Sequence, residues 1–352
     1  MKFISTDINE TNTWQIGTGD PSRSYISVFL KFGVALVGPG EPGPERDPGT
    51  IIYYAHNRSI YNWGKVLTMV KKDEWIIAKK GVQEILAIGQ VVAEYDYSNT
   101  FADVDGWDLQ HFIKVKWYRP IDGPIVFSNK PLMQSTLNAC LKPSVFEEIY
   151  KHEFEQVQPL FDVGGSRYYD PSTSLDILDP LINKGVRIQD AENIVRAIAR
   201  IIRLTSWYKE NDSDTLEAEI VTFLVVPLLI SLGWSEQKIK IEYNNIDIAI
   251  FKTPFDGDYS AQPRMILEVK KFDNGLAFTD KQILKYGDKY PGCKQYVTTN
   301  GFRYKYYERD GLWLKLKGYF NLFRYMEINP VYKGDDLFTA TQTIMKISNL
   351  IN

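Results

Sequence analysis

Cysteine and histidine are scarce in this chain of 352 residues, which contains Cys140, Cys293 and three histidines. The cysteines form no C-x-x-C pair and lie near no histidine pair, which argues against a disulfide framework and against a structural zinc site. The N-terminal residues lack the apolar stretch of a secretory leader, and the longest apolar run, 220–232, is too short to span a membrane. We therefore expect a cytoplasmic protein without membrane contact.

An excess of positive charge is also missing. The net charge is −3 and the pI about 5.8, which argues against a protein that coats nucleic acid with a uniformly basic surface. A nuclease is still compatible with this charge, because carboxylates that hold a metal lower the total. One stretch with few acids could still gather basic residues on one face: Lys281, Lys285, Lys289, Lys294, Arg303, Lys305, Arg309, Lys315 and Lys317.

Aromatic residues, in contrast, are abundant at 14%. They fill cores, but proteins also use them to stack on bases. The length exceeds what one hydrophobic core usually serves, so two domains are expected. No internal repeat is visible.

The N-terminal part reads as short strands separated by turn residues. Alternation and β-branched residues predict strands at 24–32, 74–81, 84–97 and 112–120, and the Gly- and Pro-rich segment 38–50 interrupts them. This pattern favours a small β-barrel or a strongly curved sheet over 1–135. Residues 136–186 carry mixed signals and are expected to be a connector.

Helices and strands alternate in the remaining part, 187–352. We expect helices at 190–208, with Asp190 as N-cap, and at 214–231, ending near Gly233. Strands at 238–251 and 265–271, a helix at 279–290 and a strand at 295–299 follow. Asn300-Gly301 and Asp310-Gly311 predict turns between further strands, and a helix at 335–350 ends the pattern. This order of elements predicts an α/β domain with a mixed central sheet.

The chemically informative residues are Asp247, Glu268 and Lys270. Asp247 interrupts an apolar strand, where a carboxylate is costly to bury without a cationic partner. Glu268 and Lys270 are two apart and so share one face of their strand, while Leu267 and Val269 point into a core. Two carboxylates and a lysine suit phosphodiester hydrolysis with Mg²⁺, for which Mn²⁺ is an alternative. The competing interpretation is an exposed Glu–Lys pair and a turn acid.

Together with neighbouring segments, these residues resemble the PD-(D/E)xK nucleases, in particular the nuclease domain of type I restriction subunits. The matching motifs span about 214–310, within a similar region of about 190–330. They are a helical acid running into PLLISLGW, the strand with Asp247, LEVKK, QILKY with Gln282 and Tyr286, and VTTNGFRYKYY. The resemblance implies that Asp247 and Glu268 bind metal and that Lys270 assists the attacking water. It also implies that Gln282 and Tyr286 contact the DNA backbone or brace the site.

Two residues compete for the helical acid that, by the resemblance, completes the metal shell. The family pattern leaves Glu217 and Glu219 as competitors, because the Thr-Arg or Val-Arg pair that commonly follows this acid is Ile220-Val221 here. Glu217 is favoured by its spacing from Pro227 and by the face it shares with Leu224. Both acids could instead simply favour the helix dipole.

The N-terminal strands and turns resemble a PUA-like or EVE-like barrel, a superfamily that holds flipped bases in aromatic pockets. The aromatic residues that could line such a pocket are Trp14, Tyr25, Trp63, Tyr95 and Trp107. For each of them, core packing is the alternative.

Both halves together predict a modification-dependent DNA endonuclease of a restriction system. The expected partner is double-stranded DNA with a modified base. One active site per chain implies a homodimer for double-strand cleavage, and no helicase or ATPase motif accompanies it. The alternatives are a nuclease that acts on unmodified DNA or RNA and a nucleic-acid-binding module without catalysis.

Overall fold

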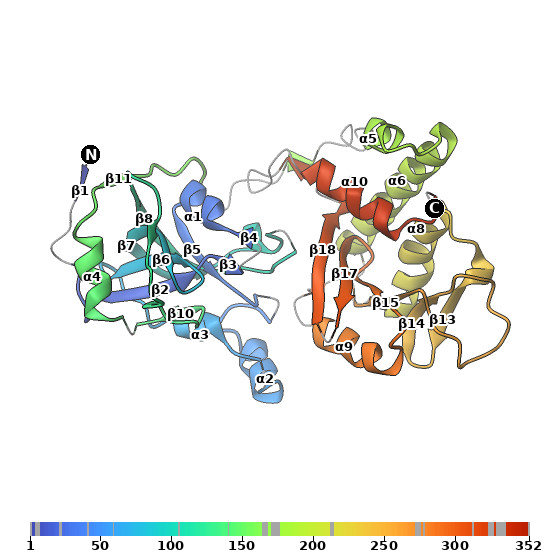
Figure 1. Ribbon diagram of the computed structural model, residues 1–352, viewed down its shortest axis with the longest axis horizontal. Coiled ribbons are helices and arrows are strands. Elements are labelled where there is room, and N and C mark those ends of the chain that lie inside the picture. Colours follow the sequence, from blue (N-terminus) through green and yellow to red (C-terminus); the bar gives the residue numbers. More distant parts are fainter. Residues whose placement is uncertain are drawn as a thin grey trace. The chain divides into compact units, whose positions relative to one another are not determined.

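The computed structural model describes residues 2–3, 8–20, 23–40, 42–58, 60–104, 106–139, 141–163, 168–169, 177–211, 215–271, 276, 279–311, 313–322, 327–328 and 336–350. The chain divides into two compact units, Met1–Ser166 and Arg167–Asn352. Figure 1 shows the first unit in blue to green and the second in green to red. Within the described ranges, no helix is long and apolar enough to cross a bilayer.

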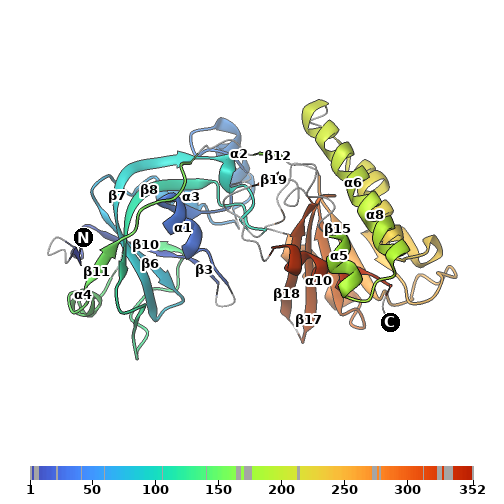
Figure 2. The same ribbon diagram turned by 90° about the horizontal axis from the view of Figure 1, so that it is seen from above.

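The first unit is built on one curved sheet that has nine strands within its described residues. Its order is β1 (Lys2–Phe3), β11 (Phe154–Gln156), β8 (His111–Pro120), β7 (Glu84–Tyr97), β6 (Trp75–Lys80), β2 (Thr13–Gly17) and β10 (Leu137–Asn138). In addition, β5 (Val34–Val37) pairs with β8, and β9 (Ile125–Val126) pairs with β7. Figure 2 shows β7 and β8 as long, bent strands, and both carry the register shifts that bend a sheet. The expected strands at 74–81, 84–97 and 112–120 are confirmed, and the sheet forms a half-barrel.

The strand expected at 24–32 is wrong, because Ile26–Phe32 form helix α1. Val28, Phe29 and Phe32 are buried on one side of this helix, and it ends at Gly33, whose φ of 60° suits glycine. β-Branched and aromatic residues led to the strand prediction, but burial against the sheet overrides such local preferences. A short hairpin of β3 (Gly19–Asp20) and β4 (Arg23–Ser24) precedes α1. The other helical segments of this unit are α2 (Pro48–His56), α3 (Trp63–Leu67), η1 (Asn99–Phe101) and α4 (Pro143–Ile149).

The segment 136–186, expected to be a connector, is largely shared between the two units. Its β10 and β11 belong to the first sheet, and α4 contributes Val145, Phe146 and Ile149 to the core beneath it. Helix α5 (Leu178–Asn183) belongs to the second unit, where Leu181 is fully buried.

The second unit is a mixed sheet between two layers of helices. Within the described residues its order is β13 (Ile239–Tyr243), β14 (Ile246–Ile250), β15 (Met265–Val269), β16 (Gln295–Thr299), β17 (Arg303–Asp310) and β18 (Trp313–Asn321). Only β15 and β16 of these neighbours run parallel, and α9 (Thr279–Lys289) connects them. A separate pair is formed by β12 (Tyr168–Tyr169) and β19 (Glu327–Ile328).

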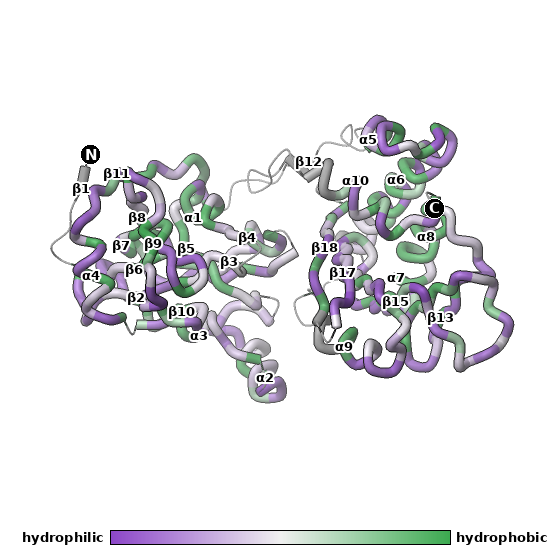
Figure 3. The backbone as a smooth tube through the Cα atoms, viewed as in Figure 1, coloured by the Kyte–Doolittle hydropathy of each residue, from purple (hydrophilic) through white to green (hydrophobic). Residues whose placement is uncertain are grey.

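One face of this sheet packs against α6 (Ile188–Asn211), α8 (Val226–Ser231) and α10 (Asp336–Ile347). Figure 2 shows α6 and α8 side by side, and α8 is largely hydrophobic in Figure 3. Ile248, Leu267 and Val269 enter this core from the sheet, as the alternation predicted for Leu267 and Val269. The opposite face packs against α9 through Ile266, Tyr296 and Ile283.

The helix expected at 214–231 has three parts. They are α7 (Glu217–Ile220), a π-helical segment (Val221–Val225) and α8. Pro227 lacks an N–H and cannot continue the regular ladder, and the N–H of Val226 donates to Val221 across a wider turn. Asp190 is not an N-cap, because α6 begins at Ile188 and Asp190 accepts from Arg187 within its first turn.

A hairpin replaces the single strand expected at 238–251. A 3-10 turn (Glu236–Lys238) leads into β13, and Asn244 and Asn245 form the loop to β14 with φ of 51° and 69°. A two-residue loop with both φ positive is the hairpin turn that matches strand twist, and asparagine tolerates it best after glycine. This turn sets where β14 begins and therefore where Asp247 lies.

Candidate active site

Asp247 and Glu268 lie on adjacent antiparallel strands, β14 and β15. The backbone pairing of these strands runs from Ile250 and Met265 to Ile248 and Leu267. Beyond it, Asp247 Oδ2 accepts a hydrogen bond of 2.6 Å from the N–H of Val269. The Asp247 side chain therefore takes the place of a backbone acceptor and is held beside β15.

Lys270 follows directly after β15, and its ammonium pairs with Glu268. Its Nζ lies 2.5 Å from Glu268 Oε1, and the Glu268 side chain is only 1% exposed. A carboxylate so deeply buried requires a compensating charge, which the ammonium supplies. The Lys270 side chain keeps 20% of its surface exposed, so the pair lies at the edge of the core.

Tyr286 reaches the same carboxylate from α9. Its hydroxyl lies 3.0 Å from Glu268 Oε2 and 2.9 Å from the carbonyl oxygen of Asn245. A single phenolic proton is shared between these two acceptors. Tyr286 thus ties the Glu268 side chain to the β13–β14 hairpin. The role that the resemblance implied for Tyr286 stays a prediction.

The environment of Asp247 favours its neutral form. The pKa of Asp247 is raised to about 6, mainly by burial, and the carboxylates of Glu268 and Glu217 contribute in the same direction. The hydrogen bond from Val269 and the charge of Lys270 act in the opposite direction. The Asp247 carboxyl thus lies where negative charges converge, an environment that a bound cation would relieve.

Glu217 and Glu219 have different surroundings on α7. The Glu219 carboxylate accepts from the N–H of Leu216 at 2.9 Å, so Glu219 caps its own helix. Glu217 instead contributes to the electrostatic field at Asp247. Glu219 therefore has a capping contact, whereas the charge of Glu217 acts on Asp247, and the choice of Glu217 as the acid of the site stays a prediction.

The residues present offer the oxygen ligands that Mg²⁺ prefers, from Asp247 and Glu268, with Glu217 near enough to affect Asp247. In the part of the chain that is described, no three His, Cys, Asp or Glu side chains are close enough to form a complete metal cluster. Mg²⁺ usually takes one or two carboxylates and keeps several waters, so two strand carboxylates fit its demands.

Gln282 belongs to α9, one turn before Tyr286. Its side chain lies outside the described residues, so its expected contact with DNA stays a prediction.

The sequence did not indicate Thr298, and it indicated Lys305 only as one of the basic residues between Lys281 and Lys317. Thr298 on β16 is opposite Glu268, and Lys305 on β17 is opposite Thr298. Both are buried, and the Thr298 hydroxyl has no hydrogen-bond partner within the described residues. Such an unpaired hydroxyl costs about 1–3 kcal/mol. Only the strand register shows that Thr298 and Lys305 continue a row across the sheet from Glu268.

The basic stretch from Lys281 to Lys317 does not form one exposed face. Lys305 is buried and donates to the carbonyl of Leu276 at 3.0 Å. Arg309 donates to the carbonyl of Gly287 in α9, and Lys315 pairs with Asp310 at 2.5 Å. Lys305 and Arg309 share one face of the sheet, whereas Lys315 is opposite Glu308 and lies on the other face. Several of these basic residues therefore have structural partners.

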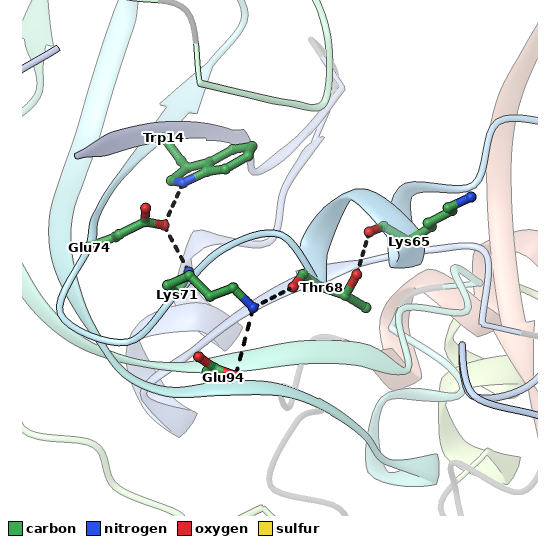
Figure 4. Close-up of polar contacts among 6 residues, drawn as sticks. All are labelled: Trp14, Lys65, Thr68, Lys71, Glu74 and Glu94. Atoms are coloured by element: carbon green, nitrogen blue, oxygen red, sulfur yellow. Dashed lines mark hydrogen bonds and ion pairs between the residues drawn. The ribbon is translucent and has the colours of Figure 1, made fainter. Parts of the chain in front are cut away.

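Trp14, in the first unit, is a half-buried residue of β2. Its indole N–H donates to Glu74 Oε2 at 2.8 Å, and the same oxygen accepts from the N–H of Lys71 (Figure 4). The indole edge is thus tied to the turn before β6. A base could contact only the remaining exposed ring surface.

Three of the other aromatic residues predicted to bind a base, Tyr25, Trp107 and Trp63, lie in two further places. Tyr25 is buried and meets the half-buried Trp107 edge to face, with ring centroids 6.0 Å apart. Trp63 starts α3 and lies 4.2 Å from the exposed ring of Tyr61. Among the described residues, these contacts pair Tyr25 with Trp107 and Trp63 with Tyr61, and a shared pocket for all five residues stays a prediction.

Tyr95 forms a polar chain with His111. The Tyr95 hydroxyl accepts from the N–H of Glu45 at 3.0 Å and lies 2.8 Å from His111 Nδ1, while His111 Nε2 lies 2.9 Å from the carbonyl oxygen of Pro39. A carbonyl oxygen can only accept, so Nε2 carries a proton and donates to Pro39. In the neutral ring, Nδ1 then accepts from the Tyr95 hydroxyl. Burial lowers the pKa of His111 to about 4 and raises that of Tyr95 to about 12.

The side chains that the fold brings together are those of Asp247, Glu268, Lys270 and Tyr286, with Glu217 within electrostatic range. They come from two adjacent strands and two helices of the second unit. No protein-family model matches the chain, and no curated protein and no solved structure is significantly similar to it.

Proposed function

We propose that the second unit is a Mg²⁺-dependent nuclease of the restriction-endonuclease-like type, with its active site at Asp247, Glu268 and Lys270. One observation carries this proposal: two carboxylates meet at adjacent strands, and an ammonium lies 2.5 Å from one of them. An exposed Glu–Lys pair, the competing interpretation, does not agree with a Glu268 that is 1% exposed. The mixed sheet, with α9 between its parallel strands, also supports the proposal.

The residues have separate tasks in this proposal. Bound Mg²⁺ would polarise the phosphodiester and lower the pKa of a bound water. Asp247 and Glu268 supply carboxylate oxygens to hold it, and Glu217 adds negative charge from α7. Lys270 carries the positive charge that orients the attacking water or stabilises the charge developing on phosphorus. Tyr286 keeps the Glu268 side chain in place.

The first unit is proposed to be a PUA-like or EVE-like module that reads a modified base in double-stranded DNA. Its half-barrel carries partly exposed aromatic rings at Trp14, Trp63 and Trp107. The Tyr95–His111 chain is buried and neutral, and such a network suits a rigid wall. A flipped base requires stacking surfaces and edge contacts to compensate for unstacking.

Recognition by one unit and cleavage by the other make a modification-dependent restriction endonuclease that acts on foreign DNA. Cleavage of both strands by one site per chain requires two copies, so a homodimer is part of the proposal.

The test is digestion of one DNA prepared with and without modified bases, in the presence of Mg²⁺. The expected result is cleavage of the modified copy alone, abolished by EDTA and by Lys270→Ala. Lys271→Ala is the matched control. Lys271 is the next residue and is exposed, and its substitution removes the same positive charge.

The outcomes separate the alternatives. Equal cleavage of both copies rejects base-modification reading and leaves a nuclease for unmodified DNA. Cleavage that Lys270→Ala does not change removes the assignment of the active site. Binding of DNA without any cleavage identifies a non-catalytic nucleic-acid-binding module.

A further inference from the structure

A row of polar side chains crosses the second sheet beside the candidate active site. Glu268 on β15 is opposite Thr298 on β16, which in turn is opposite Lys305 on β17. Residues directly opposite each other share one face of a sheet. The three have exposed fractions of 1%, 0% and 4%. The rest of this face is apolar or aromatic around Ile266 and Tyr296, so the row is an exception within a core.

Thr298 differs from its neighbour Thr299 in what its hydroxyl does. Thr299 Oγ1 accepts from the N–H of Gly301 at 2.9 Å and so holds the turn after β16. The Thr298 hydroxyl is equally buried, but it has no hydrogen-bond partner among the residues described. Valine has almost the same shape and would fit the strand without this unpaired group. The hydroxyl therefore needs a role in another state of the site.

The neighbours of Thr298 indicate what that role is. A carboxylate lies in register on one side and an ammonium on the other. A hydroxyl between these two charges can donate its proton to the carboxylate, which only accepts, whereas the ammonium only donates.

Both oxygens of Glu268 already have donors in this structure. Lys270 pairs with Oε1, and the Tyr286 hydroxyl lies next to Oε2. A divalent cation bound by the carboxylates repels the Lys270 ammonium, so Glu268 then loses a donor. Thr298 lies one strand away, and a change of its χ1 rotamer is enough to move the hydroxyl.

We propose that Thr298 is a positioning residue, which donates a hydrogen bond to the Glu268 carboxylate when a divalent cation is bound. The inference rests on the proposed function, because it assumes that Glu268 is a metal ligand. Hydrogen bonds to metal-ligating carboxylates orient them, and their loss typically lowers metal affinity about 10- to 100-fold.

The test is calorimetric titration of the full-length protein with Mn²⁺, which requires no cleavage. Thr298→Val is expected to bind Mn²⁺ roughly tenfold more weakly than the wild type. Its melting temperature without metal is expected to equal or exceed the wild-type value, because the substitution removes an unpaired buried hydroxyl. Thr298→Ser keeps the hydroxyl and is expected to restore Mn²⁺ affinity.

Thr299→Val is the matched control on the next residue. It is expected to lower the melting temperature, because the N–H of Gly301 loses its acceptor, and to leave Mn²⁺ affinity unchanged. Wild-type Mn²⁺ affinity in Thr298→Val would overturn the inference and leave the nuclease proposal intact. A wild-type protein that binds no Mn²⁺, or binds it equally well as Asp247→Asn, would overturn the metal site and the inference with it.

Discussion

The Lys270 ammonium lies 2.5 Å from Glu268 Oε1 and so occupies the space beside a carboxylate proposed to bind Mg²⁺. A single buried carboxylate thus has two possible cationic partners, one from the chain and one from solution. In the absence of metal, the ammonium compensates the charge of Glu268. If the proposed metal site is correct, bound metal would free the same ammonium for the attacking water or the phosphate. The pair would then connect the stability of the metal-free protein to the proposed catalysis.

Replacing Lys270 by methionine is expected to separate these two roles. Without divalent cations, the free energy of unfolding should fall by roughly 2 kcal/mol, because the buried Glu268 carboxylate loses its ammonium partner. The loss is moderated because the Lys270 side chain itself is 20% exposed. DNA cleavage should fall by roughly 10²-fold or more, while Mn²⁺ affinity should rise because a competitor is removed. Urea unfolding and calorimetric titration measure these effects. Lys271→Met is the control, and a Lys270→Met protein with unchanged Mn²⁺ affinity would contradict the competition.

Tyr286→Phe is expected to lower cleavage about tenfold while leaving the fold intact, since it removes only the hydroxyl that holds Glu268. The loss should appear in kcat more than in KM if Tyr286 positions the carboxylate without touching DNA. Tyr290→Phe is the matched control. Its hydroxyl accepts from Asn244 Nδ2 at 3.0 Å, so this variant should lose some stability and keep its activity. Equal activity of wild type and Tyr286→Phe would rule out the bracing role.

Glu217→Gln and Glu219→Gln form a second matched pair. Glu217→Gln removes a negative charge near Asp247 and should reduce Mn²⁺ affinity and cleavage. Glu219→Gln weakens the contact to the N–H of Leu216 and should cost about 1 kcal/mol or less of stability, with wild-type cleavage. Both are measured by titration, cleavage rate and urea unfolding. The reverse pattern would make Glu219 the acid of the site.

His111 makes the stability of the first unit depend on pH. Burial lowers its pKa from 6.5 to about 4, so between these values the unfolded chain binds a proton that the folded chain does not. The stabilisation is complete above pH 6.5 and is lost as the pH falls toward 4, by about 3 kcal/mol in total. Urea unfolding of the first unit, followed across this range, measures the slope.

Two substitutions check this assignment. His111→Gln should flatten the slope, since the titrating group is gone. His152→Gln should leave it as in the wild type, because His152 lies near Glu148 at the surface, outside the buried chain. A wild-type protein whose stability does not change between pH 6.5 and pH 4 would argue against a neutral, buried His111.

Local patterns predicted three strands of the first sheet and most strands of the second. Alternation located β6, β7, β8 and the edges of β15 and β16 within a few residues. The errors have a common cause. The segment 24–32 has the residue types of a strand, but Ile26–Phe32 fold as a helix because their apolar side packs on the sheet. The hairpin loop at Asn244-Asn245 contains no glycine, so the sequence did not indicate a turn there. In both cases packing against distant residues decided between two locally allowed structures.

Period-two spacing alone determined that Glu268 and Lys270 share a face and that Leu267 and Val269 face a core. An isolated acid in an apolar strand was enough to single out Asp247. The sequence could not determine which strands are neighbours or in which register, since pairing depends on contacts far apart in the chain. Only the tertiary structure brought Tyr286 to Glu268, gave Glu219 a capping contact on its own helix, and placed Thr298 opposite Glu268 in the sheet.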